Sequence, residues 1–457
     1  MAPAAAGWRG AGGALSEHPA GRAGGSGYLA ILREHRGFRL LFSARVISLA
    51  GDWMALLALF ALLREVRGSD PRALAGLLIL KLLPLFLAGP IAGVVADRFS
   101  RRAVMIASDL ARTALVLALL AAPVVPWPLA YVYTLVALQV VGSAFFEPAR
   151  SAAIPQLVPE RHLTAANALG AIAWSAVFAA GSLAGGVVTD RLGWRAALAI
   201  DAATYVVSAL LVYRIELPRR RRAAGPIDWR TVTGLRDLAE GIGFIVSRPS
   251  VATVLLLKSG WGIAGAITLL LTLFGERVYP IAGRPDLGIA LLYFARAVGT
   301  GIGPVIARRL AAAETPERLR RLIAGAFLWA AFWYSVFASV RSPWAAALAV
   351  TAAHFGGSAI WVYSTVMLQK MVPDRFLGRV MSTDLGLATM AISAATFVYG
   401  RLAESAAADL RLLARILALS LVVPCLVWLA ATSRWPLDLG RERAGRTSPL
   451  GSGAARE

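Results

Sequence analysis

Ionisable side chains inside long apolar segments are the residues of this sequence best suited to chemistry. Arg45 and Asp52 lie seven residues apart in one apolar run, so a helix would place them on one face, about 10 Å apart. Lys81, in the next apolar run, is expected at a similar depth, where it could pair with Asp52. Because burying a charge in lipid costs a few kcal/mol, each such residue is a functional candidate. We take Asp52 as the leading proton-coupling candidate, with a fixed structural ion pair as the equal alternative.

Other apolar runs also contain charges. Asp109 and Arg112 are three residues apart, a spacing that favours an ion pair within one helix, and we interpret this pair as structural although it stays a coupling candidate. Lys258 and Asp384 fall at similar depths and could pair. A lone buried histidine is more often a hydrogen-bonded packing residue than a proton relay. The candidates for lining a cavity in the second half of the chain are Lys258, Arg296, His354 and Asp384.

The stretch GPIAGVVADRFSRRAVMIASD, residues 89–109, crowds charges between two apolar runs. A glycine lets helices approach closely, and a carboxylate can accept hydrogen bonds from the N-terminus of a neighbouring helix. A basic residue of the turn, Arg101, could pair with Glu147 at the end of a later apolar run. We predict a latch between helices, with an ordinary basic turn as the alternative. Its candidate residues are Gly93, Asp97, Arg98, Arg101, Arg102 and Glu147.

The composition shows which elements must position these residues. Hydrophobic residues make up 58% and charged residues 16% of the 457 residues, whereas soluble chains are about half apolar and a quarter charged. The excess lies in runs of about 20 residues, long enough to cross roughly 30 Å of hydrocarbon. We therefore predict an all-α integral membrane protein, since an open strand edge cannot be satisfied in lipid. The net charge of +21 comes mainly from arginines in short connections, which favours contact with lipid headgroups over nucleic acid.

Twelve membrane-spanning helices are predicted. One set of connections, which includes DRFSRR and PRRRR, has roughly three times as many basic residues as the other and is expected to face the cytoplasm. Both termini would then be cytoplasmic, in a protein of the cell membrane. The predicted spans are 38–63, 73–96, 103–125, 127–146, 167–189, 194–216, 250–275, 286–309, 321–340, 343–369, 377–400 and 409–432.

Six spans, a basic linker and six further spans predict two helical bundles, as in transporters built from repeated halves. The linker contains DWRTVTGLRDLAEGIGFIV, which is typical of an amphipathic helix on the membrane surface. The expected parts are a flexible cytoplasmic tail (1–37), a six-helix bundle (38–216), the linker (217–249), a second six-helix bundle (250–432) and a cytoplasmic tail (433–457).

The stretch around Asp97 resembles the signature of the major facilitator superfamily, a Gly and an Asp-Arg followed by basic residues, with Ser100 where the family usually has Gly. Residues 145–169 (FFEPARSAAIPQLVPERHLTAANAL) and 372–382 (VPDRFLGRVMS) are similar to the enterobactin-exporter and macrolide-efflux branch. The resemblance covers residues 38–432. It implies the major facilitator fold, in which the Asp97 latch would hold the two bundles together on the cytoplasmic side.

GSLAGG, residues 181–186, resembles the antiporter motif of the same superfamily, with Ser182 in place of Pro and Val177 in place of an upstream Gly. Its glycines, Gly181, Gly185 and Gly186, are expected to pack helices together. The arginine that many drug antiporters have in span four is missing here, so the family's usual proton relay cannot be transferred to this chain.

These observations favour a secondary transporter that exports an amphipathic small molecule in exchange for protons. The cargo would be a drug or macrolide, or a siderophore. None of the three lysines follows a glycine, so the chain cannot form the phosphate-binding loop of an ATP-driven pump. A single cysteine, Cys425, excludes an internal disulfide and a cysteine-based metal cluster. We expect no enzyme activity, cofactor or metal, and a monomer in the lipid bilayer. The alternatives are a lysophospholipid flippase or other facilitated transporter and, from a different class, a receptor or scaffold.

Overall fold

The computed structural model describes residues 25–217, 243–310, 315–404 and 409–437, and these are almost entirely helical. The helices of the first half are α1 (Gly25–Glu34), α2 (Arg36–Arg67), α3 (Pro71–Leu80), α4 (Leu83–Arg98), α5 (Arg101–Ala118), α6 (Pro128–Leu157) and α7 (Leu163–Tyr213), with the 3-10 helices η1 (Leu119–Val124) and η2 (Glu160–His162). The second half contains α10 (Pro249–Gly262), η3 (Ile263–Ala266), α11 (Ile267–Arg277), α12 (Pro285–Leu310), α13 (Pro316–Ser339), α14 (Pro343–Met371), α15 (Asp374–Leu402), α16 (Leu410–Ser420) and α17 (Val422–Arg434).

In the part of the chain that the structure describes, eleven helical stretches are long and apolar enough to cross a membrane. The longest, Ala165–Tyr213, has 49 residues and would measure about 74 Å if straight, more than twice the hydrocarbon thickness. Gly193 interrupts α7 with a left-handed φ of 82°, which a residue with a side chain rarely adopts. The chain turns back there, so α7 supplies two crossings and the predicted number of twelve is confirmed.

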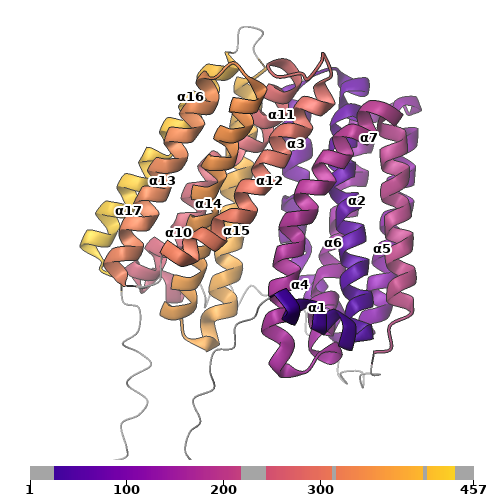
Figure 1. Cartoon of the computed structure of the whole chain (residues 1–457), viewed down its shortest axis with the longest axis horizontal. Coiled ribbons are helices and arrows are strands. Elements are labelled where there is room, and N and C mark those ends of the chain that lie inside the picture. Colours follow the sequence, from indigo (N-terminus) through magenta and orange to yellow (C-terminus); the bar gives the residue numbers. More distant parts are fainter. Residues whose placement is uncertain (1–24, 218–242, 311–314, 405–408, 438–457) are drawn as a thin grey trace, which may run out of the picture.

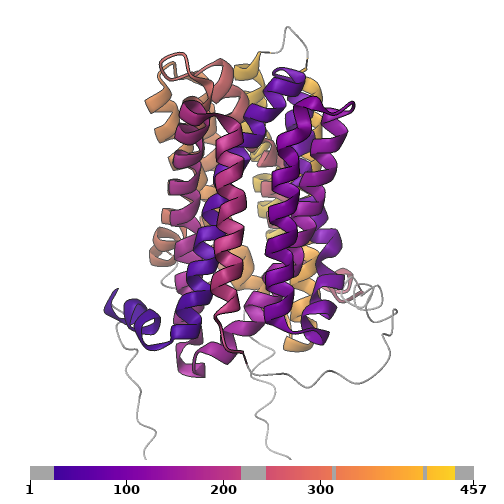
Figure 2. The ribbon, with the colours of Figure 1, turned by 90° about the vertical axis from the view of Figure 1, so that its right-hand side faces the viewer.

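The helices form two bundles that lie side by side (Figure 1). Helices α1–α7 make the amino-terminal bundle and α10–α17 the carboxy-terminal bundle. In both views α1 lies across one end of the amino-terminal bundle (Figures 1 and 2), and Figure 1 shows that α17 finishes at that same end of the molecule. We call this end the α1 face and the opposite end, which has the turn at Gly283, the Gly283 face.

The core has two parts. A large buried cluster runs through both bundles, whereas a smaller one, with Phe38, Met105 and Phe146, lies near the α1 face of the amino-terminal bundle. Ile31 of α1 is only 4% exposed and belongs to the smaller cluster. Residues 25–34 therefore form a packed helix, which corrects the prediction of a flexible tail there. Burial of the apolar face of α1 explains the difference.

The two bundles contact each other at the Gly283 face through charged side chains. Arg64 of α2 pairs with Asp286 of α12, and Arg72 of α3 pairs with Glu404 after α15. Asp190 of α7 accepts a 2.7 Å bond from Arg284. Because each pair joins residues from different bundles, these contacts must break if the Gly283 face is to open.

Most of the predicted linker helix, and the residues 1–24 and 438–457 of the predicted tails, lie outside the described residues. The described end of the linker forms a short helical turn at residues 243–246.

Candidate transport site

Arg45 lies between two carboxylates in the amino-terminal bundle. One of its guanidinium nitrogens is 2.7 Å from Glu147 of α6, and the other is 3.7 Å from Asp52 on its own helix. Glu147 also accepts a 2.9 Å hydrogen bond from Arg150. The spacing of Arg45 and Asp52 thus places them on one face of α2, as predicted.

Asp52 connects to the interior of the bundle through a chain of hydrogen bonds. The hydroxyl of Tyr205 donates to Asp52 Oδ1 at 2.5 Å, the amide of Gln139 donates to Tyr205 at 2.9 Å, and Lys81 donates to Gln139 at 3.1 Å. The predicted ion pair between Asp52 and Lys81 is therefore wrong, because Tyr205 and Gln139 lie between them. Gln139 is the only amide in its apolar run, which marks it in the sequence as a candidate member of such a chain.

Lys81 lies at a break in span two, between α3 and α4. Pro84 follows in the first turn of α4, where its ring clashes with the carbonyl of Leu80 in any continuous helix. From this break the ammonium group of Lys81 reaches Gln139.

Asp201 of α7 is completely buried, and neither of its carboxylate oxygens has a hydrogen-bond partner among the described residues. A Cβ added at Gly51 would lie 2.4 Å from Asp201 Oδ1, so the carboxylate packs directly against α2, one residue from Asp52. An unpaired negative charge at this position would be costly. Asp201 is thus a second acid of this region that a proton would stabilise.

Asp109 and Arg112 form the predicted pair within α5, with side chains 0% and 1% exposed. The Arg112 guanidinium lies 4.2 Å from the centre of the Tyr205 ring, and one of its nitrogens donates to Ser143 at 3.3 Å. The pair thus packs against the ring of Tyr205, which agrees with the interpretation of Asp109 and Arg112 as a structural ion pair.

A cavity of about 280 Å³ opens beside Arg45 in the half of the bundle nearer the α1 face. Its walls come from α2, α6 and α7. Glu147, Arg150, Asn167 and Trp174 line it together with apolar side chains of the smaller core cluster. The charged group of Arg45 and Glu147 is therefore accessible from a space that can hold water or part of a cargo molecule.

Aromatic side chains lie between the bundles, near the middle of the part of α7 that precedes Gly193. Trp53 stacks on Phe178 with ring centres 3.9 Å apart, and Trp174 lies 5.5 Å from Phe178. Arg296 of α12, in the other bundle, lies 5.7 Å from the centre of the Phe178 ring and donates to Thr268 at 2.8 Å. This places one of the predicted second-half candidates beside a cluster of aromatic rings.

The other second-half candidates are buried. Lys258 and Asp384 form an ion pair with side chains 4% and 1% exposed, and Lys258 lies 4.9 Å from the centre of the Trp361 ring. His354 hydrogen-bonds to Tyr334 at 3.2 Å and to the carbonyl of Val350 at 3.2 Å, which is the packing arrangement expected for it.

The predicted latch region is described only in part. The surroundings of Gly93 and the side chain of Asp97 lie outside what the structure describes. Arg101 donates to the carbonyl of Ala152 at 2.5 Å, and Arg102 lies over the ring of Tyr213 at 4.6 Å. Among the described residues Glu147 pairs with Arg45 and Arg150, so the predicted pair with Arg101 is not formed. Arg45 takes its place because it approaches Glu147 from the facing helix α2.

The glycines of GSLAGG hold α7 against two neighbours. A Cβ at Gly181 or Gly185 would lie within 3 Å of Trp53 or Met54 in α2. A Cβ at Gly186 would lie 2.2 Å from the Cβ of Ala290 in α12, across the boundary between the bundles. The glycines of this stretch therefore allow close packing of α7 against α2. The last one, Gly186, allows close packing against α12 near the Gly283 face.

The Major Facilitator Superfamily matches residues 41–384 of this sequence, well over half of its length. The chain belongs to this superfamily. Members of the superfamily are membrane transporters and not enzymes.

Relatives and solved structures within the superfamily are distant. The chain is 26% identical over half its length to the uncharacterized transporter YfiS of Bacillus subtilis, covering 53% of that protein. It is 25% identical over 48% of its length to macrolide efflux protein A of Streptococcus pyogenes, covering 54% of it. The chain thus spans about half the length of these two curated relatives. A bacterial homolog of the human lysosomal transporter Spinster, solved in an inward-facing and occupied conformation, has a TM-score of 0.70 at 14% identity, covering 88% of this chain and 97% of that one.

Proposed function

We propose that this superfamily member is a proton-coupled exporter of an amphipathic small molecule. The observation that carries the proposal is the position of Arg45 between Glu147 and Asp52, beside the cavity. One guanidinium shared by two carboxylates lets the binding of a proton to either acid change the ion pair that Arg45 makes.

The two oxygens of Asp52 have different neighbours. Tyr205 donates to Oδ1, whereas the contact with Arg45 is made by Oδ2. A proton can therefore bind at Oδ2 without disturbing Tyr205, and it would weaken the attraction to Arg45. Arg45 would then be held by Glu147 alone, which ties α2 more firmly to α6 beside the cavity. A proton on Glu147 would have the opposite effect and loosen α2 from α6.

Such a change drives transport only if it favours one conformation over the other. A difference of about 1.4 kcal/mol changes the ratio of two conformations tenfold. The ion pairs between Arg64 and Asp286 and between Arg284 and Asp190 keep the Gly283 face closed in the conformation described. We infer that alternating access requires these pairs to break while new contacts form at the α1 face, where the Asp97 latch is proposed.

The aromatic cluster of Trp53, Trp174 and Phe178, of which Trp174 is exposed, has Arg296 beside it and supports a partly aromatic or apolar cargo. Distant similarity to macrolide efflux protein A points to the same class, a drug or macrolide, with a siderophore as the alternative.

We also propose that the protein lies in the cell membrane as a monomer with both termini in the cytoplasm. The arginine-rich connections and the common position of α1 and α17 at the α1 face support this orientation (Figure 1). A reporter that is active only outside the cytoplasm should be inactive when it is fused after Glu457. An active fusion would contradict the proposed orientation.

Proteoliposomes test the function directly. Purified protein is reconstituted with an acidic interior, and the uptake of a labelled macrolide is compared with uptake in the absence of a pH gradient. We expect accumulation that depends on the gradient and disappears with a protonophore. Movement of labelled lysophospholipid without any dependence on pH or membrane potential would instead favour the flippase alternative. Failure to move either of these cargoes, or a labelled siderophore tested in the same way, would favour a receptor or scaffold.

A further inference from the structure

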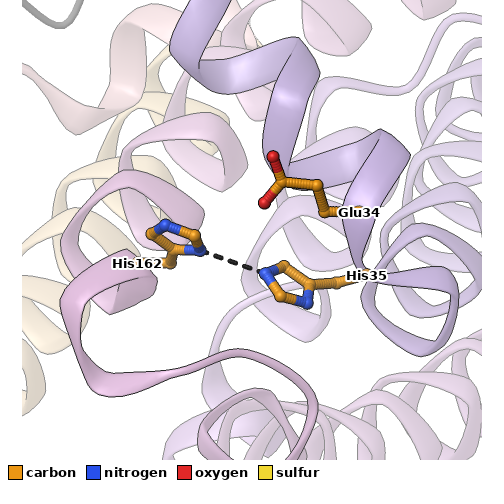
Figure 3. Close-up of side chains that lie close together, drawn as sticks. All are labelled: Glu34, His35 and His162. Carbon is orange, nitrogen blue, oxygen red and sulfur yellow. Dashed lines mark hydrogen bonds between the residues drawn. The ribbon is translucent and has the colours of Figure 1, made fainter.

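Two histidines and a glutamate from distant parts of the chain meet at the α1 face (Figure 3). Glu34 ends α1, His35 joins α1 to α2, and His162 lies in η2, between α6 and α7. His35 Nε2 lies 3.0 Å from His162 Nδ1, and a carboxylate oxygen of Glu34 completes a set of three atoms that all lie within 4.8 Å of one another. The two histidines are 127 residues apart in the sequence, which is why no metal site was expected there.

We propose that Glu34, His35 and His162 bind a divalent transition-metal ion such as Zn²⁺. Two imidazoles and a carboxylate are the donors that zinc accepts, and a water molecule would complete a four-coordinate site. Zinc–nitrogen bonds of about 2.0–2.1 Å in a tetrahedral site place the two nitrogens roughly 3.3 Å apart. The observed separation of 3.0 Å needs to open by only a few tenths of an ångström.

The protonation of the two rings is compatible with this site. In the hydrogen-bonded pair one imidazole donates and the other accepts. On metal binding the donor ring must place its proton on its other nitrogen, so that both facing nitrogens offer a lone pair. Neither ring needs to gain or lose a proton. In Figure 3 the Glu34 carboxylate points toward the histidine pair.

The surroundings supply further negative polarity. Glu34 is the last residue of α1, so the ion would lie at the negative end of the helix dipole. The guanidinium of Arg39 donates to the carbonyls of Leu32 and Arg33 at 3.0 and 3.3 Å, so its charge offsets part of this dipole. Glu34 is exposed and both histidines are partly exposed, so an ion can reach them from solution.

Binding there would fix the start of α2 to the start of α7. Phe38, three residues after His35, and Ala166, four residues after His162, both line the cavity beside Arg45. A bound ion would therefore hold two walls of that cavity at a set distance on the α1 face.

Zinc binding to the full-length protein tests the site, independently of transport. The protein is purified in detergent through a tag without histidine, and Zn²⁺ is titrated by calorimetry; the visible absorption of Co²⁺ then reports the coordination geometry. We expect one site in the wild type and an increase in melting temperature with Zn²⁺. Replacing a direct ligand should lower the affinity at least roughly tenfold, the loss typical of even outer-sphere partners.

Three ligand variants and two controls distinguish the site from stray binding. His35→Ala, His162→Ala and Glu34→Gln should each lose affinity. Glu160→Gln, on the same 3-10 turn as His162, and His18→Ala, the histidine near the amino terminus, should bind as the wild type does. Glu34→Gln keeps the hydrogen bond between the two histidines, so it still tests the site if the histidine variants fail to fold. Wild-type binding that is absent, or that is unchanged in all three ligand variants, would show that His35 and His162 form only a hydrogen bond.

Discussion

The hydroxyl of Tyr205, in α7, donates a hydrogen bond of 2.5 Å to the carboxylate of Asp52, in α2. This bond joins a membrane-embedded acid beside Arg45 to a polar chain that continues through Gln139 to Lys81. The ring of Tyr205 is in turn held by Arg112. Asp52 is thus fixed on its interior side and free to exchange its contact with Arg45 on the other.

The first prediction concerns Asp52 as the proton carrier. Asp52→Asn should keep cargo binding but lose the dependence of efflux on the proton gradient, because an amide cannot take up a proton at this position. Transport is measured in proteoliposomes with and without a pH gradient, and binding is measured separately. A variant that still concentrates cargo at the wild-type rate would exclude Asp52, and Glu147, Asp109 and Asp201 would be tested next.

Tyr205→Phe should weaken the same coupling less severely, since it removes the hydrogen bond to Asp52 but leaves the carboxylate in place. Tyr131→Phe is the matched control. It removes a hydroxyl from the same bundle that donates only to the carbonyl of Ala118, at 3.0 Å, and it should leave coupling unchanged.

The second prediction concerns the closed Gly283 face. Arg64→Ala removes an ion pair with side chains only 20% and 15% exposed, and it should shift the protein toward a conformation with this face open. A charge-assisted hydrogen bond contributes about 1.5–3 kcal/mol, so the population ratio should change roughly tenfold or more. Spin labels at Arg67 and Arg341, one in each half of the chain, would report longer distances.

Arg195→Ala provides the control for the Gly283 face. Arg195 pairs with Glu65 at 3.1 Å, but both residues belong to the amino-terminal bundle. This pair does not join the bundles, so its loss should leave the label distances unchanged. Equal effects of the two substitutions would mean that surface charge, and not the pair between bundles, controls the face.

The third prediction concerns packing at the same face. Gly186→Ala should destabilise the closed conformation, because its new methyl group would lie 2.2 Å from the Cβ of Ala290 and 2.9 Å from the carbonyl of Asp286. Adding Ala290→Gly removes the first clash and should restore part of the closed population, as measured with the same labels. A double variant no better than Gly186→Ala would place the strain at the backbone instead.

The fourth prediction concerns the buried pair of Lys258 and Asp384. Lys258→Met alone leaves an uncompensated carboxylate and should lower stability by about 3–5 kcal/mol. Replacing both residues, with Lys258→Met and Asp384→Leu together, should recover most of this loss because no buried charge remains. Thermal unfolding in detergent compares Lys258→Met, Asp384→Leu and the double variant, and a double variant less stable than both single ones would contradict this account.

The fifth prediction concerns the proposed latch on the α1 face. Asp97→Asn should impair transport at unchanged expression, since its carboxylate is proposed to accept hydrogen bonds from a helix N-terminus in one conformation only. A shift of about 1–2 kcal/mol, roughly tenfold in population, is expected. Asp70→Asn is the control: Asp70 caps α3 by accepting from Arg72 at 2.8 Å, and asparagine caps equally well. Normal transport by Asp97→Asn would argue against the latch.

Much of the architecture follows from the sequence alone. Runs of about 20 apolar residues require helices in lipid, and prolines such as Pro71 and Pro128 open helices within a few residues of the predicted span ends. The ion pair of Asp109 and Arg112 also follows from local spacing, because residues three apart on a helix are neighbours whatever surrounds them. Helix α1 was missed, because its ten residues are too short to cross a membrane and its burial depends on Ile31 packing against distant helices.

The partners of the buried charges were decided by the tertiary structure. Whether Asp52 meets Lys81 or Tyr205 depends on the rotation and depth of α7 relative to α2, and hydrophobic periodicity does not specify either. The same holds for Glu147, which Arg45 reaches from α2 in place of Arg101, and for His35 and His162. Helix formation uses hydrogen bonds between residues four apart, which the sequence determines locally. Contacts between residues 100 or more positions apart exist only once the helices have packed. The packing of the helices therefore determines which distant carboxylate forms an ion pair with Arg45.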